Sequence, residues 1–102
     1  MDVNREIKRT VDTGKVILGT NKSINSLKTG NAKMIIYTQN CPKSIKEDIL
    51  YYSKISSIPI LEFGGTSLEL GTVCGKPFLV SVIAVMSPGE SNILSGGKVY
   101  GN

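Results

Sequence analysis

Four short runs of apolar residues, rich in β-branched side chains, recur along the chain and are separated by segments with helical periodicity. The runs cover residues 16–18, 32–37, 58–63 and 78–85, and their length and composition are typical of buried strands. The run at 32–37 is apolar at nearly every position, which favours a strand covered by helices on both faces. Alternating strands and helices therefore predict a three-layer α/β/α sandwich in which at least part of the sheet is parallel.

Capping residues predict where the first helices begin and end. Asp2 is expected to cap a first helix that ends at Gly14. A second helix is expected to begin in the turn at residues 19–22 and to end at Gly30. A third is predicted from Pro42, which suits the first helical position. The spacing of its apolar residues predicts an inner face made of Ile45, Ile49 and Leu50.

Two further capping signals lie on either side of the last predicted strand. Thr66 and Glu69 have the spacing of a capping box, so a helix is predicted to start at Thr66 and to stop at Gly75. Residues 87–90 repeat this spacing and include a proline suited to a first helical turn. They predict one last short helix over residues 90–94.

The length of 102 residues, of which 40% are hydrophobic, predicts a single soluble domain, with a frayed end at residues 95–102. The longest apolar run, 78–86, includes Ser81 and is far shorter than the roughly 20 residues that a membrane-spanning helix needs. Residues 1–5 lack the apolar segment of a signal peptide. We therefore expect a cytoplasmic protein with no membrane partner.

Isolated cysteines and the absence of histidine restrict the chemistry of the chain. Cys41 and Cys74 lack the spacing of a zinc site, and no histidine is available as a base for a thiol nucleophile. The sequence therefore predicts two reduced thiols, no metal and no other cofactor.

The charge balance and the loop positions favour a polyanionic ligand. Twelve Lys and Arg residues against eight Asp and Glu residues give a net charge of +4 at pH 7. Loops that follow parallel strands meet at one edge of a sheet, where ligands of open α/β sheets bind. Residues 19–22, 38–42 and 64–66 are expected to converge there.

The turn after the first strand contains groups that suit RNA. Gly19 would let a ligand approach the backbone closely. Thr20, Asn21 and Lys22 would present hydrogen-bond donors and a cation to phosphate at a helix N-terminus. A plain capped turn explains the same residues equally well, because the phosphate-binding pattern of a P-loop is absent.

Two later segments carry similar groups. Asn40 is expected to be exposed after the second strand, where its amide would either bind a ligand or stabilise the turn. Lys76 and Phe78 are expected at the start of the last strand, where a cation beside an aromatic ring suits RNA. The alternative is that Phe78 is simply the first core residue of that strand.

Taken in their order and spacing, these segments resemble the ribosomal protein L30e family, which comprises large-subunit proteins of archaeal and eukaryotic ribosomes. That family lies within the wider L7Ae group of kink-turn RNA binders. The resemblance covers nearly the whole chain and is carried by residues 19–23, 37–42, 64–78 and 89–91. It implies an α/β/α sandwich with a four-stranded mixed sheet, a site for a sharply bent internal loop of RNA, and no enzymatic activity.

The resemblance also implies residue roles. The turn at Gly19 would contact the RNA backbone and bases, Asn40 would bind a purine edge, and Phe78 and Val80 would meet an extruded base. These roles agree with RNA recognition through unstacked bases, aromatic rings and short polar side chains. The full set of candidate RNA-binding residues is Gly19, Thr20, Asn21, Lys22, Lys28, Asn40, Lys43, Lys46, Gly65, Lys76, Phe78 and Val80.

Two positions differ from the family pattern. A lysine that some members have after the glycine turn corresponds to Asn21, with Lys22 one place further on. An arginine in the helix after the asparagine corresponds to Ile45, with Lys43 and Lys46 nearby. The L7Ae branch typically has Asn-Glu where this chain has Asn21 and Lys22, so the comparison favours the L30e branch.

We therefore predict a structural protein of the large ribosomal subunit that binds kink-turn ribosomal RNA through a single domain, residues 1–102. We expect it to be a monomer away from the ribosome, with its own messenger RNA as an optional further ligand. The alternatives are a non-ribosomal RNA- or protein-interaction module of the same fold and, less favoured, a thiol enzyme.

Overall fold

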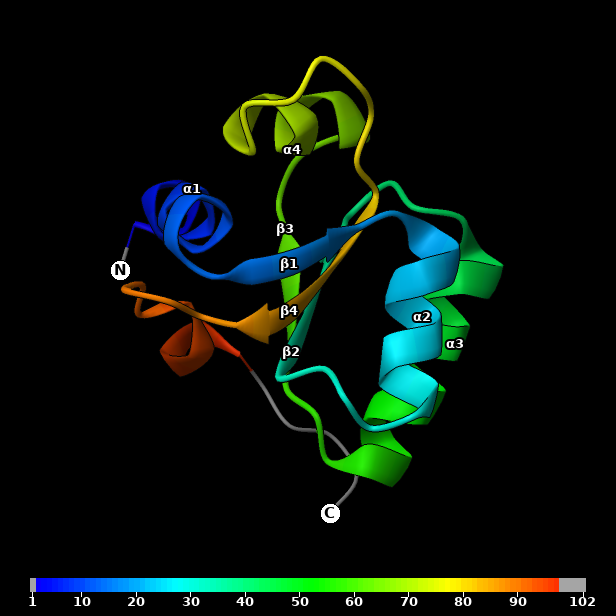
Figure 1. The fold of residues 1–102 in the computed structure, drawn as a ribbon. Coiled ribbons are helices and arrows are strands. Elements are labelled where there is room, and N and C mark those ends of the chain that lie inside the picture. Colours follow the sequence, from blue (N-terminus) through cyan, green and yellow to red (C-terminus); the bar gives the residue numbers. More distant parts are fainter. Residues whose placement is uncertain (1, 98–102) are drawn as a thin grey trace.

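The computed structural model describes residues 2–97, in which helices and strands alternate as predicted (Figure 1). The expected frayed end lies largely outside the described residues. The elements are α1 (Val3–Thr13), β1 (Lys15–Leu18), α2 (Thr20–Lys28), β2 (Met34–Thr38), α3 (Lys43–Ser56), β3 (Ile60–Phe63), α4 (Ser67–Val73), β4 (Val82–Ser87) and the 3₁₀ helix η1 (Ile93–Gly96). No helix among these combines the length and apolar character needed to cross a membrane.

The four strands form one mixed sheet in the order β1-β4-β2-β3. β4 is antiparallel to both of its neighbours, β1 and β2, whereas β2 and β3 are parallel. β1, β2 and β3 therefore run in the same direction and end at the same edge of the sheet, where β4 begins. We call this region the loop edge; it comprises residues 19–22, 39–42, 64–66 and 76–81. The predicted four-stranded mixed sheet is confirmed.

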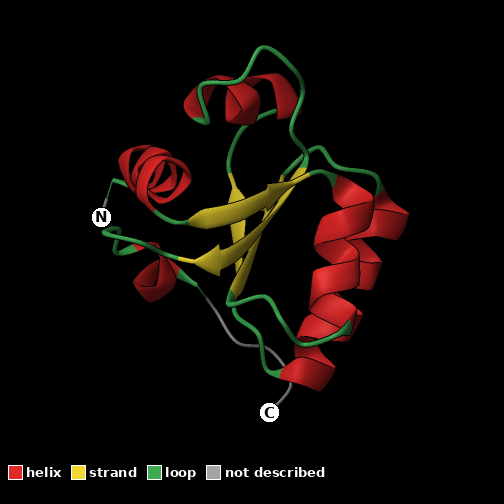
Figure 2. Cartoon of the chain, viewed as in Figure 1, coloured by secondary structure: helices red, strands yellow, loops and turns green. Residues whose placement is uncertain are grey.

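Helices cover both faces of the sheet, so the predicted three-layer sandwich is also confirmed (Figure 2). α2 and α3 pack on one face, and α1, α4 and η1 pack on the other. Successive residues of β2 alternate between the two cores, as the two-residue repeat of a strand requires. Ile35 and Tyr37 face α2 and α3, while Met34 and Ile36 face the opposite core, and all four are buried.

The predicted caps of α1 and α4 are confirmed. The carboxylate of Asp2 accepts a hydrogen bond from the N–H of Arg5 at 3.2 Å. Thr66 and Glu69 form the capping box, in which each side chain accepts a hydrogen bond from the backbone N–H of the other residue. Gly75 has φ +74° directly after the α4 C-cap, which is the left-handed conformation that stops helices.

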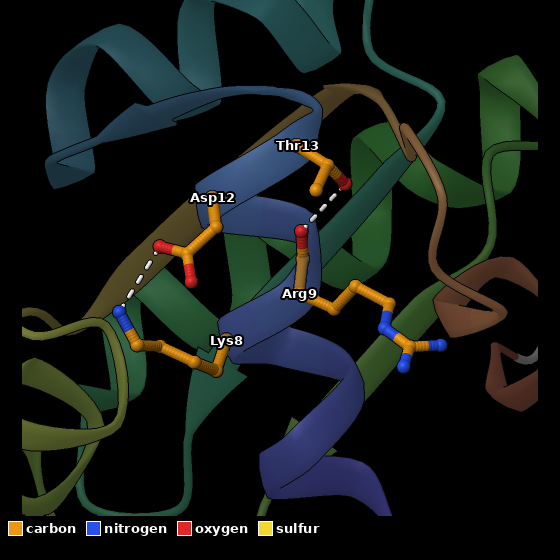
Figure 3. Close-up of polar contacts among 4 residues, drawn as sticks. All are labelled: Lys8, Arg9, Asp12 and Thr13. Atoms are coloured by element: carbon orange, nitrogen blue, oxygen red, sulfur yellow. Dashed lines mark hydrogen bonds and ion pairs between the residues drawn. The ribbon is translucent and has the colours of Figure 1, made fainter.

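The outward face of α1 carries charged side chains (Figure 3). Lys8 forms an ion pair with Asp12, one helical turn away, at 3.0 Å, and the Thr13 hydroxyl donates to the carbonyl of Arg9 at 2.7 Å. Because the Lys8–Asp12 pair is exposed to solvent, it contributes little to folding stability.

The last strand begins later than predicted. β4 starts at Val82, and residues 76–81 form a loop in which Phe78 is 52% exposed and Leu79 is 68% exposed. The neighbouring strands give the physical reason, because β1 ends opposite Ile83 and the pairing with β2 reaches no further than Ser81. The residues before Ser81 lie on α4 instead of in the sheet.

Two smaller predictions are wrong. Leu50 is 38% exposed, because Ile49 and Ser53 define the buried line of α3 and Leu50 lies about 100° away around the helix. No helix starts at Glu90, whose N–H donates instead to the Thr13 hydroxyl at 2.9 Å. The short helix η1 follows three residues later, without a side-chain cap.

α4 supports the loop at residues 76–81. The N–H of Val80 donates to the carbonyl of Ser67 at 3.1 Å, and the hydroxyls of Ser67 and Ser81 lie 2.7 Å apart. Gly71 allows the loop to lie directly on the helix, because a Cβ at this position would overlap the carbonyl oxygen of Phe78. The position of the loop thus depends on the absence of a side chain at residue 71.

We predict that Gly71→Ala lowers the free energy of unfolding by about 1–3 kcal/mol, because the added methyl group must displace the backbone at Phe78. Gly64→Ala is the matched control, since a Cβ there would meet no atom within 4 Å. Urea unfolding of both variants measures the difference. Equal midpoints for the two variants would contradict the close contact between α4 and the loop.

Candidate RNA interface

The loop edge is held together by backbone hydrogen bonds. At its centre, the carbonyls of Ser81 and Val82, at the start of β4, accept hydrogen bonds from the ends of the two neighbouring strands. The N–H of Gly19 donates to Val82 at 3.1 Å, and the N–H of Thr38 donates to Ser81 at 2.9 Å. The N–H of Gln39 donates to Phe63 at 3.0 Å. The three loops predicted to converge therefore do so, and residues 76–81 lie with them in the upper part of Figure 1.

Two helices begin at this edge without a side-chain cap. α2 follows Gly19 and α3 follows Pro42, which occupies the N-cap position one place before its predicted location. Within residues 2–97, neither N-cap residue makes a side-chain hydrogen bond to the first N–H groups of its helix, in contrast to the N-caps of α1 and α4. These N–H groups are open to a ligand, and the positive ends of the two helix dipoles favour an anion.

Gly19 adopts φ +134°, a conformation that favours glycine, and no atom lies within 4 Å of the place where its Cβ would be. The backbone at the start of α2 is therefore accessible from solvent, as predicted. A ligand can approach it without meeting a side chain at this position. Thr20 and Asn21 follow in the same turn, half-exposed and exposed respectively.

Asn40 is exposed in the turn between β2 and α3, as predicted. The turn is braced on both sides, since the N–H of Cys41 donates to Thr38 at 3.2 Å and the ammonium group of Lys46 donates to Gln39 at 3.1 Å. Within residues 2–97, the side chain of Asn40 has no hydrogen-bond partner. A rigid turn thus presents a free amide to solvent.

Three exposed apolar residues lie on adjoining segments at the loop edge, Phe78 and Leu79 in the loop before β4 and Leu68 in the first turn of α4. Leu68 is 65% exposed on α4. The backbone of the loop is joined to that of α4 beside these residues, because the N–H of Val80, which follows Leu79, donates to the carbonyl of Ser67, which precedes Leu68. The exposure of Phe78 argues against the alternative that it is merely a core residue. Exposed apolar groups of this size commonly mark a binding surface.

Val80 and Gly65 are less accessible than the other candidates. Val80 is only 2% exposed and packs in the core beneath α4, where it supports Phe78 and Leu79 from inside. Gly65 is half-buried against the ring of Phe63 and the carboxylate of Glu69, which would repel phosphate.

The candidate lysines divide into two groups. Lys22 and Lys43 are exposed in the first turns of α2 and α3, and Lys76 is exposed in the loop before β4. Lys46 is half-buried and braces the turn before α3. Lys28 lies at the far end of α2, with its ammonium nitrogen 5.2 Å from the centre of the Tyr52 ring, so the structure does not bring it to the loop edge.

Sequence reasoning missed Leu68, Leu79 and the uncapped start of α3. The signal for Leu68 was present, because residues 68 and 70 point about 200° apart on a helix and Leu70 fills the core. Leu79 had no such local signal, because its exposure follows from where β1 and β2 end along β4.

Both cysteines are buried, as expected of structural thiols. Burial raises the pKa of the Cys41 thiol, with a smaller opposing effect from the charge of Lys46. Burial likewise raises the pKa of Cys74, opposed by Lys76 and Lys8. Residues 2–97 contain no cluster of three or more His, Cys, Asp or Glu side chains that could hold a metal ion.

Comparison with known proteins identifies the family. The profile of the ribosomal protein L7Ae/L30e/S12e/Gadd45 family matches residues 1–95. The chain belongs to this family. The resemblance inferred from the loop residues is thereby confirmed, and a member of this ribosomal protein family is not an enzyme.

Archaeal relatives named large ribosomal subunit protein eL30 match this family member over nearly its full length. The protein of Methanosphaera stadtmanae is 54% identical over 94 residues, which cover 92% of this chain and 96% of the relative. That of Methanothermobacter thermautotrophicus is 51% identical with the same coverage. That of Methanocaldococcus jannaschii is 50% identical and covers 92% of this chain and 86% of the relative.

We predict that both thiols of the folded protein react with a disulfide reagent at pH 8 at least about tenfold more slowly than those of the urea-unfolded chain, because burial hinders access and raises both pKa values. Absorbance of the released thiolate measures the two rates. Rapid labelling of the folded protein would contradict the burial of the two thiols.

Proposed function

We propose that this protein is a structural component of the large ribosomal subunit and binds a kink-turn of ribosomal RNA at the loop edge. The names of the archaeal relatives support the ribosomal assignment. The observation that carries the proposal is the meeting of two uncapped helix N-termini, a free asparagine amide and a half-exposed phenylalanine at one edge of the sheet.

The backbone of the RNA is bound by the helix N-termini and by lysines. The free N–H groups at the starts of α2 and α3 donate to phosphate oxygens, as at other anion sites on helix N-termini. Lys22, Lys43 and Lys76 add three exposed positive charges around them. Lys46 acts indirectly, by holding the carbonyl of Gln39 and hence the turn that presents Asn40.

The bases are recognised by Asn40 and by the apolar surface of Phe78, Leu79 and Leu68. An asparagine amide both donates and accepts, which matches the edge of a purine. The half-exposed ring of Phe78 offers a stacking surface for a base that has left the helix.

These groups favour a bent internal loop over a regular duplex. An A-form helix keeps its bases stacked and its major groove too narrow for side chains, so neither Asn40 nor Phe78 would find a partner there. A sharply bent loop exposes base edges and extruded bases together with closely spaced phosphates.

We further propose that the chain acts in the cytoplasm as one domain and is a monomer away from the ribosome. A messenger RNA of its own that contains the same kind of bend would bind the same edge. Gly65 and Lys28 contribute little to RNA binding in this proposal. Gly65 lies against the carboxylate of Glu69, and Lys28 lies at the far end of α2.

We expect Asn40→Ala to weaken binding to a kink-turn RNA by about 1–3 kcal/mol, since the substitution removes the amide that reads a base edge. Asn31→Ala is the matched control, because Asn31 is exposed at the opposite edge of the sheet, before β2. Isothermal titration measures both affinities. If the two variants bind alike, Asn40 is only a turn residue.

Lys22→Ala and Phe78→Ala should differ in their response to salt. Loss of a phosphate-binding lysine flattens the slope of log affinity against log salt by about one unit or less and weakens all RNAs alike. Loss of a stacking ring leaves the slope unchanged and weakens the binding free energy by about 1–3 kcal/mol. The loss of affinity is greatest for RNAs with an extruded base.

Fluorescence anisotropy at several salt concentrations measures both effects, with thermal melting as the check on folding. Lys54→Ala and Tyr51→Ala are the matched controls, because both residues are exposed in the later part of α3, away from the loop edge. Full affinity of a well-folded Phe78→Ala protein would refute the stacking role.

A further inference from the structure

β1 is an edge strand with one open side. It pairs only with β4 within the described sheet. The N–H of Gly19 donates to Val82 of β4. In an antiparallel ladder the backbone N–H and C=O groups of alternate residues point toward the partner strand, so those of Ile17 also point toward β4. The backbone groups of Val16 and Leu18 therefore point away from β4. No described residue accepts from or donates to these outward groups. Such an edge is a template for another strand.

A groove of about 500 Å³ runs along this open side. We call it the β1 groove; it is lined by Val11, Gly14, Lys15, Val16, Ile17, Leu18, Lys76 and Met86. The apolar residues among them are all half-exposed, whereas every residue of the central strand β2 is buried. The groove therefore offers main-chain hydrogen bonds and apolar contacts together.

The charged residues that line the β1 groove are lysines. Lys15 and Lys76 are both exposed, and no carboxylate is among the lining residues. Lysine at a sheet edge discourages pairing with a second positively charged strand but favours an acidic one. Charge complementarity thus selects the kind of segment that fits.

We propose that the β1 groove binds an extended segment of a partner protein, with a β-branched centre and acidic residues on either side, which adds to the sheet as a fifth strand. The main-chain groups of Val16 and Leu18 pair with the segment, and Lys15 and Lys76 attract its carboxylates. This interaction goes beyond RNA binding, because the pairing strand lies outside the loop edge and only Lys76 is common to the two surfaces.

Other occupants fit the groove less well. RNA lacks the alternating N–H and C=O groups that complete a β-ladder, and its phosphates gain nothing from the half-exposed apolar side chains. A second copy of the chain would bring Lys15 and Lys76 of both molecules together across a strand of only four residues.

The test is an NMR titration of the ¹⁵N-labelled protein with a blocked peptide of alternating valine and threonine flanked by aspartates. We expect shifts of the amide signals of residues 16–18 and slower hydrogen exchange at Val16 and Leu18. Val16→Pro should weaken the affinity for the peptide by about tenfold or more, because it removes an outward N–H that does not bond to β4. The affinity of this variant for kink-turn RNA should be unchanged.

Lys15→Glu is a second variant, which decides the outcome if Val16→Pro fails to fold. It should weaken the affinity for the peptide several-fold at low salt. Lys33→Glu makes the same charge change at an exposed residue outside the groove, so it should leave the affinity for the peptide unchanged. The proposal is overturned by unchanged signals at residues 16–18, or by Lys15→Glu and Lys33→Glu having equal effects. Shifts that follow protein concentration without peptide would also overturn it, because they indicate self-association.

Discussion

The hydrogen bonds around the start of β4 hold the candidate RNA interface in place. β4 runs against β1 and β2, so it begins where they end. The carbonyls of Ser81 and Val82 accept from Thr38 on one side and from Gly19 on the other. One short segment of chain thereby fixes the turn before α2, the turn after β2 and the loop that carries Phe78. A displacement of β4 along its axis would separate all three.

Helix capping explains why this edge, and not another, suits an anion. α1 and α4 satisfy their first N–H groups with Asp2 and with Thr66, whereas Gly19 and Pro42 have no side chain that can do so for α2 and α3. An unused N-cap costs roughly 1 kcal/mol of helix stability. The two uncapped helices start side by side at the loop edge, where the proposed RNA would supply the missing acceptors.

Local signals made much of the fold predictable. The capping box of Thr66 and Glu69 lies within one turn of helix, so its geometry follows from the sequence alone. The same spacing at residues 87–90 failed, because Thr13, distant in the chain, accepts from the N–H of Glu90. Phe78 was placed in a strand because its neighbours are apolar, whereas β1 and β2 end opposite Ile83 and Val82, so no described strand pairs with residue 78.

The site was predictable to the extent that it depends on strand direction. Gly19 and Asn40 follow the first and second strands, and they meet at one edge because β1 and β2 run in the same direction. Lys28 and Val80 could not be placed this way. The length of α2 carries Lys28 to the far end of the helix, and the alternation of side chains in the loop buries Val80 while exposing Leu79.

The central claim is that the loop edge recognises the shape of a bent RNA rather than its charge. The most direct measurement compares the affinity for a kink-turn RNA with that for a straight duplex of equal length and composition, at one near-physiological salt concentration. The net charge of +4 supplies only weak general attraction, so the account predicts a preference for the kink-turn on the order of 100-fold or more. Equal affinity for the two RNAs would contradict it.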